Sequence, residues 1–226
     1  MNADIDRLSH LRQAKEALDA GDLEGVREQL DRAERQARTL KDYSISWIAD
    51  SLSFIAEELG EEAVERALRR FGERHLAPTD DDNDLWAVPA EVRAKVVTRA
   101  MLANFGAVDV DEDDDKITLS FRCGSGGWLI DQGAYDGSDA LVTLRERGPR
   151  TFDRDELPVY CAHCSVNNEM QAVEWRGTLT TVEHPPTAPG EPCVHEVYKR
   201  PDAVPAEAYS RIGLSRPATR DPSDRS

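Results

Sequence analysis

The spacing of the apolar residues changes once along this chain, near Gly106, and this change constrains the fold more than any other feature. Before Gly106 the apolar residues recur with the period of amphipathic helices. After it they alternate, as in Ile117, Leu119 and Phe121, which would share one face of a half-buried strand. The order of the two patterns predicts an α+β protein, with an N-terminal helical region followed by a mainly antiparallel sheet domain.

The individual elements follow from the same periodicities. Helices are expected at residues 3–20, 23–40, 43–59, 61–75 and 89–104, and a short helix at 164–170. The 61–75 segment is the clearest, because its acidic first turn and basic last turn complement the helix dipole. Strands are expected at residues 107–110, 116–121, 128–130, 140–144, 178–183 and 194–198.

Polar stretches suggest where the domains divide. The run Pro78–Asp84 is acidic and lacks apolar residues, so it predicts a linker between a helical region, 1–79, and an α+β metal-binding domain, 85–200. After Lys199 the chain turns polar and contains several prolines. This composition predicts a disordered tail over residues 201–226.

The charge balance limits the possible partners. A formal net charge of −16 disfavours binding to nucleic acid or to an anionic membrane, because both would repel the chain at long range. The first residues contain no apolar core, and no apolar run is long enough to cross a bilayer. We therefore expect a cytoplasmic protein that binds neither membrane nor nucleic acid.

The four cysteines are the main candidates for chemistry. Cys161 and Cys164 are separated by two residues, a spacing that lets two thiolates hold one metal ion. Cys123 and Cys193 each lie at the end of a predicted strand. Four thiolates from three segments would satisfy the tetrahedral preference of zinc, which is the predicted cofactor, with an iron–sulfur cluster as the alternative. Four inert buried thiols, or redox chemistry at Cys161 and Cys164, are the competing interpretations.

Two histidines lie beside these cysteines. His163 stands between Cys161 and Cys164, and His195 follows Cys193 by two residues, so that it would share a strand face with it. Either histidine is an alternate metal ligand that would leave one thiol free. His163 is also a catalytic candidate, since a histidine beside Cys164 could hold that sulfur as a thiolate. Glu169 is a candidate general acid–base group if it faces a pocket.

The run Cys123-Gly124-Ser125-Gly126-Gly127 directly follows a predicted strand. Glycines adopt backbone angles that are closed to other residues, so amides here could converge on an anion or wrap a metal-bound sulfur. Gly124, Ser125, Gly126 and Gly127 are therefore predicted ligand-binding residues. A plain tight turn explains the run equally well.

Two segments resemble known families. Leu59–Leu68 is similar to the helix ahead of the α+β core in L-2-amino-thiazoline-4-carboxylic acid hydrolase-like proteins. Gly190-Glu191-Pro192-Cys193, with the strand after it, resembles the closing strand of 4-vinyl-reductase-type small-molecule-binding domains. The resemblance implies a ligand-binding α+β domain with Cys193 near the pocket or the metal.

These observations lead to three functional hypotheses. The first is a metal-binding protein, most simply zinc-binding, whose α+β domain binds a small molecule or a protein partner. The second is a hydrolase that acts on a small amide or thiazoline-like substrate through metal-bound water or a cysteine thiolate. The third is a helical interaction protein whose cysteines are incidental.

Overall fold

A computed structural model describes residues 8–78 and 84–217 of the chain. It divides into two compact units at Ile45–Ser46. We call the described part of the first unit, residues 8–45, the hairpin, and that of the second, 46–78 and 84–217, the body. The predicted linker at 78–84 lies largely outside the described residues. The division falls at Ile45 instead, because Leu52, Val64 and Leu68 belong to the same buried cluster as the C-terminal half of the chain.

The hairpin consists of α1 (His10–Asp19) and the first half of α2 (Leu23–Leu59). Gly21 turns the chain with a φ of 75°, and the Asp22 side chain accepts a hydrogen bond from the N–H of Gly25 at 2.9 Å, which caps α2. The two separate helices expected at 23–40 and 43–59 form one continuous helix. No glycine or proline interrupts residues 40–43, so nothing in the backbone ends the helix there.

The helices of the body begin with the second half of α2, which is followed by α3 (Glu61–His75) and α4 (Ala90–Ala103). Gly60 joins α2 to α3 with a φ of 83°, a conformation that favours glycine. The bounds of α3 confirm the prediction residue for residue. Pro89 precedes α4 directly, as its fixed φ favours at a helix start.

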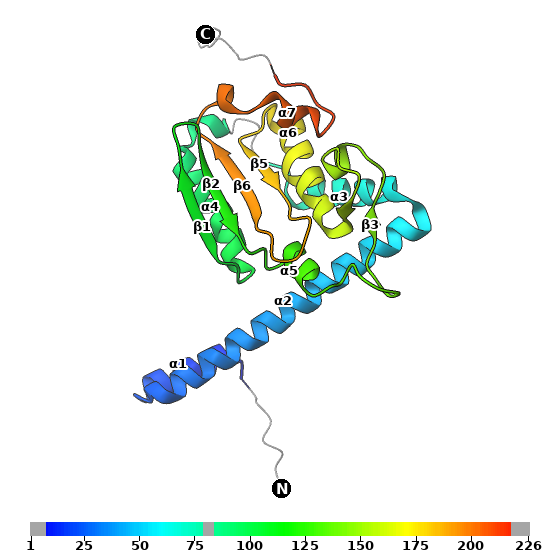
Figure 1. Cartoon of the computed structure of the whole chain (residues 1–226). Helices are drawn as coiled ribbons and strands as arrows, with labels where there is room; N and C mark the ends of the chain where they lie inside the picture. The colour runs from blue at the N-terminus through cyan, green and yellow to red at the C-terminus, as the bar shows by residue number, and fades with distance from the viewer. Residues whose placement is uncertain (1–7, 79–83, 218–226) are drawn as a thin grey trace. The chain divides into compact units, whose positions relative to one another are not determined.

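The body contains a four-stranded antiparallel sheet with the order β1-β2-β6-β5, shown in Figure 1. The strands are β1 (Val108–Glu112), β2 (Lys116–Phe121), β5 (Thr181–His184) and β6 (Cys193–Tyr198). Ile117, Leu119 and Phe121 of β2 are buried and pack in one cluster with Ala94 and Met101 of α4. The α+β class predicted from the sequence is therefore confirmed.

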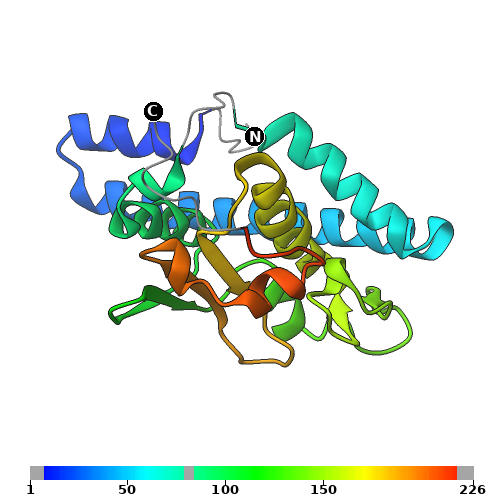
Figure 2. The ribbon, with the colours of Figure 1, turned by 90° about the horizontal axis from the view of Figure 1, so that it is seen from above.

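A second core lies beside the sheet, built from short elements. These are β3 (Thr143–Leu144), β4 (Leu157–Pro158), a π-helix (Cys164–Met170), α6 (Gln171–Arg176) and α7 (Ala206–Ser210). The short helix α5 (Gly126–Asp131) precedes them in the chain. Figure 2 shows the π-helix and α6 between α3 and the sheet. The close approach depends on Gly72 of α3, where an added Cβ would lie 2.0 Å from the side-chain oxygen of Gln171.

The strand expected at 128–130 is wrong, because these residues form part of the helix α5. A three-residue apolar run does not distinguish a buried strand from a buried helix turn, and Gly126 and Gly127 allow a helix to start there. The strand expected at 140–144 shrinks to the two residues of β3. The short helix predicted at 164–170 is present, although its hydrogen bonding is that of a π-helix.

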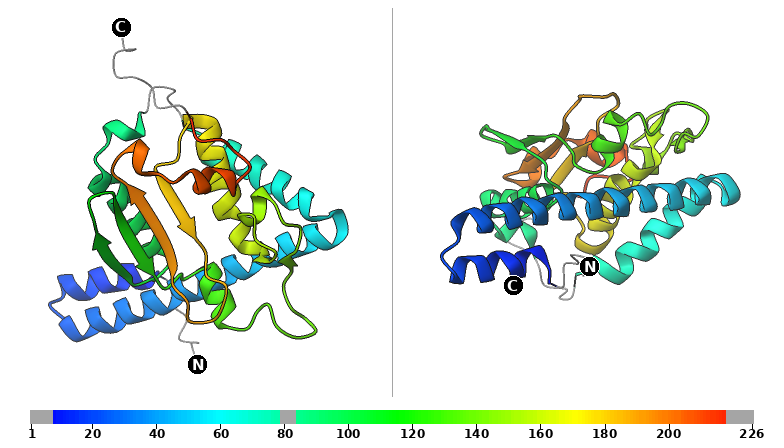
Figure 3. Two further views of the ribbon diagram at one scale, coloured as in Figure 1. Left: turned by 45° about the horizontal axis from the view of Figure 1, so that its top comes forward. Right: turned by 90° about the horizontal axis from the view of Figure 1, so that it is seen from below.

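The C-terminal segment up to residue 217 differs from the predicted disordered tail. Val204, Ala208, Tyr209 and Ile212 are buried in the second core, and the Tyr209 hydroxyl accepts a hydrogen bond from the N–H of Leu179 at 3.0 Å. Figure 3 shows this segment, with α7, packed against the rest of the body. Residues 218–226, the end of the predicted tail, lie outside the described residues.

No helix in the described part of the chain combines the length and the apolar character that a membrane crossing requires. The most exposed strand, β1, is the acidic edge of the sheet, with only Val108 partly buried. Charge and a short length are common ways in which natural proteins protect a sheet edge from pairing with another chain.

Candidate functional site

All four cysteines lie in one region of the body. Cys123 follows β2, Cys161 and Cys164 flank the turn into the π-helix, and Cys193 begins β6. The register of the sheet pairs Cys193 with Phe121, two residues before Cys123. Cys161, Cys164 and Cys193 are buried, Cys123 is half-buried, and all four are free thiols. We call these residues the thiol cluster.

The glycine run holds two members of this cluster. An added Cβ at Gly126 would lie 2.8 Å from the sulfur of Cys161, and one at Gly127 would lie 2.9 Å from the Cβ of Cys123. Only glycine therefore allows α5 to approach both cysteines. The Ser125 hydroxyl lies 3.2 Å from the Cys123 sulfur. These contacts give the glycines a packing role, and ligand binding by Gly124–Gly127 stays a prediction.

The electrostatics of the thiols show how closely the cluster is gathered. Burial, followed by the nearby Cys123, raises the pKa of Cys161 to about 12. Burial, Glu183 and the other three cysteines together raise the pKa of Cys164 well above its ordinary value. Burial, then Cys123, raise the pKa of Cys193. A cation among these sulfurs would reverse the effect, since a metal-bound thiol is deprotonated outright.

His163 makes the closest contact between a histidine and a thiol of the cluster. Its Nδ1 lies 2.6 Å from the carbonyl oxygen of Tyr160, so Nδ1 donates a proton to that oxygen. The other ring nitrogen, Nε2, then carries a lone pair and lies 3.5 Å from the sulfur of Cys164. The Tyr160 ring packs edge-on against the imidazole, with 5.0 Å between the ring centroids. His163 is thereby oriented toward Cys164.

His195 and Glu183 form a buried pair on the sheet beside the cluster. They are cross-strand neighbours on β6 and β5, and His195 Nδ1 lies 3.4 Å from Glu183 Oε1. Asn168 of the π-helix donates to both carboxylate oxygens at 3.1 Å. Burial lowers the pKa of His195 against the opposing charge of Glu183. His195 shares a strand face with Cys193, as the alternation predicts.

Glu169 lies nearby but has a different role. Its side chain is fully buried, and Oε1 accepts hydrogen bonds from the backbone N–H of Glu183, at 2.6 Å, and from Arg211. Arg211 also donates to the carbonyl oxygen of Glu183 at 2.9 Å. Together the two side chains satisfy the backbone N–H and C=O of Glu183 in β5, as a neighbouring strand would. We therefore interpret Glu169 as a residue that fixes the π-helix to the sheet.

The predicted site residues thus differ in what the structure brings together. The four cysteines, His163 and His195 share one region, and Gly126 and Gly127 pack against it. Sequence reasoning missed Glu183, Asn168 and Arg211. No local sequence pattern marked Glu183 or Arg211 as site residues. Strand pairing brings Glu183 to the site, and the ordered C-terminal segment brings Arg211. Asn168 could have been found as a polar residue in the helix after Cys164.

The thiol cluster is gathered without forming a set of metal ligands. Within residues 8–78 and 84–217, no group of three or more His, Cys, Asp or Glu side chains is positioned to hold a metal ion. The cysteine side chains would have to rotate before a metal ion could bind to them.

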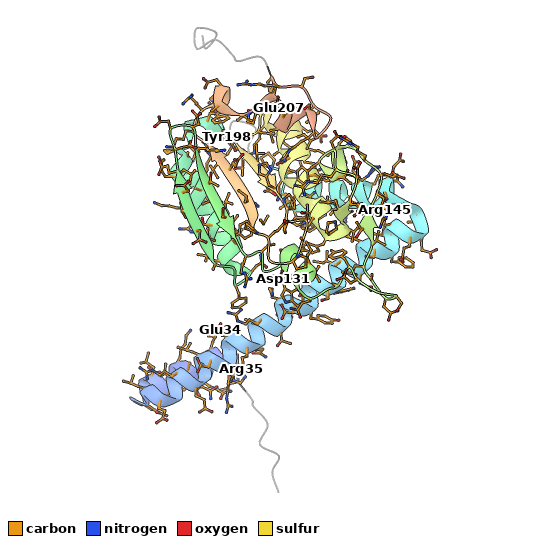
Figure 4. All side chains as sticks on the ribbon, in the orientation of Figure 1. Glu34, Arg35, Asp131, Arg145, Tyr198 and Glu207 are labelled. Atoms are coloured by element: carbon orange, nitrogen blue, oxygen red, sulfur yellow. The ribbon has the colours of Figure 1, made fainter. Side chains whose placement is uncertain are left out.

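The loop that leads into Cys193 is anchored to α5. Asp131 of α5, labelled in Figure 4, accepts a hydrogen bond from the N–H of Gly190 at 2.7 Å.

Comparisons of the chain with protein-family models, with curated proteins and with solved structures gave no match. The resemblance to thiazoline hydrolase-like and 4-vinyl-reductase-type domains therefore stays a prediction.

Proposed function

We propose that the body binds a metal ion, most simply zinc, through Cys123, Cys161, Cys164 and Cys193. The observation that supports this proposal is the convergence of all four cysteines, although Cys123 and Cys193 are far from the Cys161–Cys164 pair in sequence. Zinc prefers four such ligands in tetrahedral geometry.

Binding would change the protonation of the cluster. Cys161, Cys164 and Cys193 are protonated at neutral pH because burial raises their pKa values, so zinc would displace their protons and its affinity would rise with pH. Four sulfurs complete the coordination of zinc and leave no position for substrate, which makes the site structural. An iron–sulfur cluster is the alternative cofactor with the same ligands.

His163 and His195 are the alternate ligands. With Nδ1 of His163 donating to the carbonyl oxygen of Tyr160, the nitrogen that faces Cys164 is the one that a neutral imidazole would offer to a metal. His195 has Glu183 on its Nδ1 side, an arrangement that resembles the carboxylate–histidine pairs found behind metal sites. If either replaces a cysteine, the thiol most readily released is Cys123, the most exposed of the four.

The test is the zinc content of the purified full chain and of four single Cys→Ser variants. We expect one zinc per chain in the wild type and loss of zinc in each variant. The matched control is Ser125→Ala, which removes the hydroxyl beside Cys123 but no proposed ligand, and it should keep its zinc. A wild type without zinc after exposure to one equivalent, with all four thiols still titratable, would contradict the proposal.

The resemblance to small-molecule-binding domains suggests a second binding function for the body. We infer that the body also binds a small molecule or a protein partner close to Cys193. This inference is supported by the buried polar groups beside that residue, His195 and Glu183, since a buried ionisable group with a shifted pKa, such as His195, often marks a functional site.

A hydrolase is the second candidate function, and the contact between His163 Nε2 and Cys164 at 3.5 Å favours it. In that reaction the Cys164 sulfur attacks the carbonyl carbon of a small amide, and its proton passes to His163. His163 returns the proton to the leaving amine as the C–N bond breaks. Water then hydrolyses the thioester, which releases the acid and restores the thiol.

Alkylation by iodoacetamide distinguishes the two functions. In a zinc site, added zinc protects all four cysteines. In the hydrolase, Cys164 is modified faster than Cys123 even though Cys164 is the more buried residue, and the variant His163→Ala abolishes this preference. Mass spectrometry of the digested protein identifies the modified cysteine.

A further inference from the structure

The hairpin leaves most of its large apolar side chains in solvent. The exposed fraction is 58% for both Leu11 and Leu18 of α1, 67% for Leu23 and 65% for Leu40 of α2. Among residues 8–45, only Ala14 and Ile45 are buried apolar residues. Two helices with so little buried surface are marginal alone, since most helical stability comes from packing of an amphipathic face.

The apolar residues of the hairpin follow a regular spacing. On α2, Leu23, Val26, Leu30, Ala33, Ala37 and Leu40 alternate steps of three and four residues. On α1, Leu11 and Leu18 are seven residues apart, the same repeat. This is the pattern of helices that pack against other helices in coiled coils and bundles. It predicts that the missing partner is itself helical.

The apolar residues of both helices meet in a groove. Leu11 of α1 and Ala33, Ala37, Leu40 and Tyr43 of α2 line it, and its volume is about 640 Å³. The polar residues that line it are Ser9, His10, Gln36 and Thr39. A groove lined by both apolar and polar residues suits the apolar face of an amphipathic helix.

The charge of the hairpin favours a second copy of the same chain as the helical partner. Residues 8–45 contain seven Lys or Arg and eight Asp or Glu, a net charge of −1, whereas the whole chain carries −16. Much of that charge is paired within α2, as in Arg32 with Glu28 and Arg38 with Glu34, whose position Figure 4 labels. Two copies of this chain can therefore approach through their hairpins without the repulsion that the rest of the chain would impose.

We propose that two copies of the chain associate through their hairpins, with α1 and α2 of each forming an antiparallel four-helix bundle. The same surface on both copies would meet across a twofold axis, the commonest symmetry of homodimers. Leu11, Leu30 and Leu40 then lie inside the bundle. This interface is independent of the thiol cluster, so either proposal can fail without the other.

The test measures the mass of the full chain in solution by light scattering after size-exclusion chromatography, at about 100 µM, well above a micromolar Kd. We expect the wild type at twice the chain mass of 25.2 kDa. The double variant Leu30→Lys/Leu40→Lys should be monomeric with an unchanged circular dichroism spectrum, because both side chains are exposed in the single chain.

The matched control is Val96→Lys/Val110→Lys, which adds the same charge at residues of the body that are 61% and 64% exposed. It should remain dimeric. Three results would overturn the proposal: a monomeric wild type, a dimeric Leu30→Lys/Leu40→Lys variant, or a control that becomes monomeric. The first of these would indicate that another protein covers the groove.

Discussion

The hairpin and the body differ in what they expose and what they bury: the hairpin exposes apolar side chains, and the body buries ionisable ones. The hairpin holds its leucines in solvent, with Leu23 and Leu40 more than half exposed, and it carries almost no net charge. The body buries ionisable groups, with Glu169 fully enclosed and Glu183 and His195 nearly so. Exposed apolar surface indicates an interface and buried polar groups indicate a site. The comparison therefore supports the two proposals, association through the hairpin and chemistry in the body.

The largest effect that would sharpen this contrast is the loss of Arg211. In Arg211→Ala, the Glu169 carboxyl group and the carbonyl oxygen of Glu183 each lose a hydrogen-bond donor, so we expect a destabilisation of about 1–3 kcal/mol for each of these two buried acceptors. Urea unfolding of the full chain measures it. Arg145→Ala, which removes an exposed ion pair with Glu156, should cost at most about 1 kcal/mol. Equal losses of unfolding free energy in the two variants would mean that the buried pair stabilises the fold no more than the exposed pair does.

A leucine substitution tests the apolar side of the contrast. Leu144→Ala, at a fully buried position of β3, should destabilise the body by about 2–5 kcal/mol, through lost burial and the cavity left behind. Leu18→Ala in the hairpin should change the unfolding free energy by less than about 0.5 kcal/mol in dilute, monomeric protein. A large loss in Leu18→Ala would show that the hairpin is folded against a surface in the single chain.

A smaller effect concerns pH. Burial raises the pKa of Glu169 from 4.5 to about 8, despite the opposing charge of Arg211. The folded chain therefore holds this proton more tightly than the unfolded chain, so its contribution to stability is complete below pH 4.5 and is lost as the pH rises toward 8. Urea midpoints measured across this range should fall with pH, and less so in Glu169→Gln. The exposed-site variant Glu156→Gln should leave the slope unchanged.

These contrasts were only partly visible in the sequence. The bounds of α3 and β2 could be predicted because their apolar residues keep one period and their ends carry clear signals. The helix α5 could not, since Trp128-Leu129-Ile130 fits a strand equally well. The order of residues 201–217 was hidden by prolines, although Val204, Ala208 and Ile212 are spaced as on one helical face. Glu183 and Arg211 reach the site only through tertiary structure, which no local pattern reports.

The central claim, a metal held by the sulfurs of the thiol cluster, is tested most directly by X-ray absorption at the zinc edge. The measurement uses the full chain loaded with one equivalent of zinc. We expect four sulfur neighbours at about 2.3 Å. A coordination shell made only of nitrogen and oxygen at about 2.0–2.2 Å would contradict the claim, because the zinc would then be bound outside the cluster.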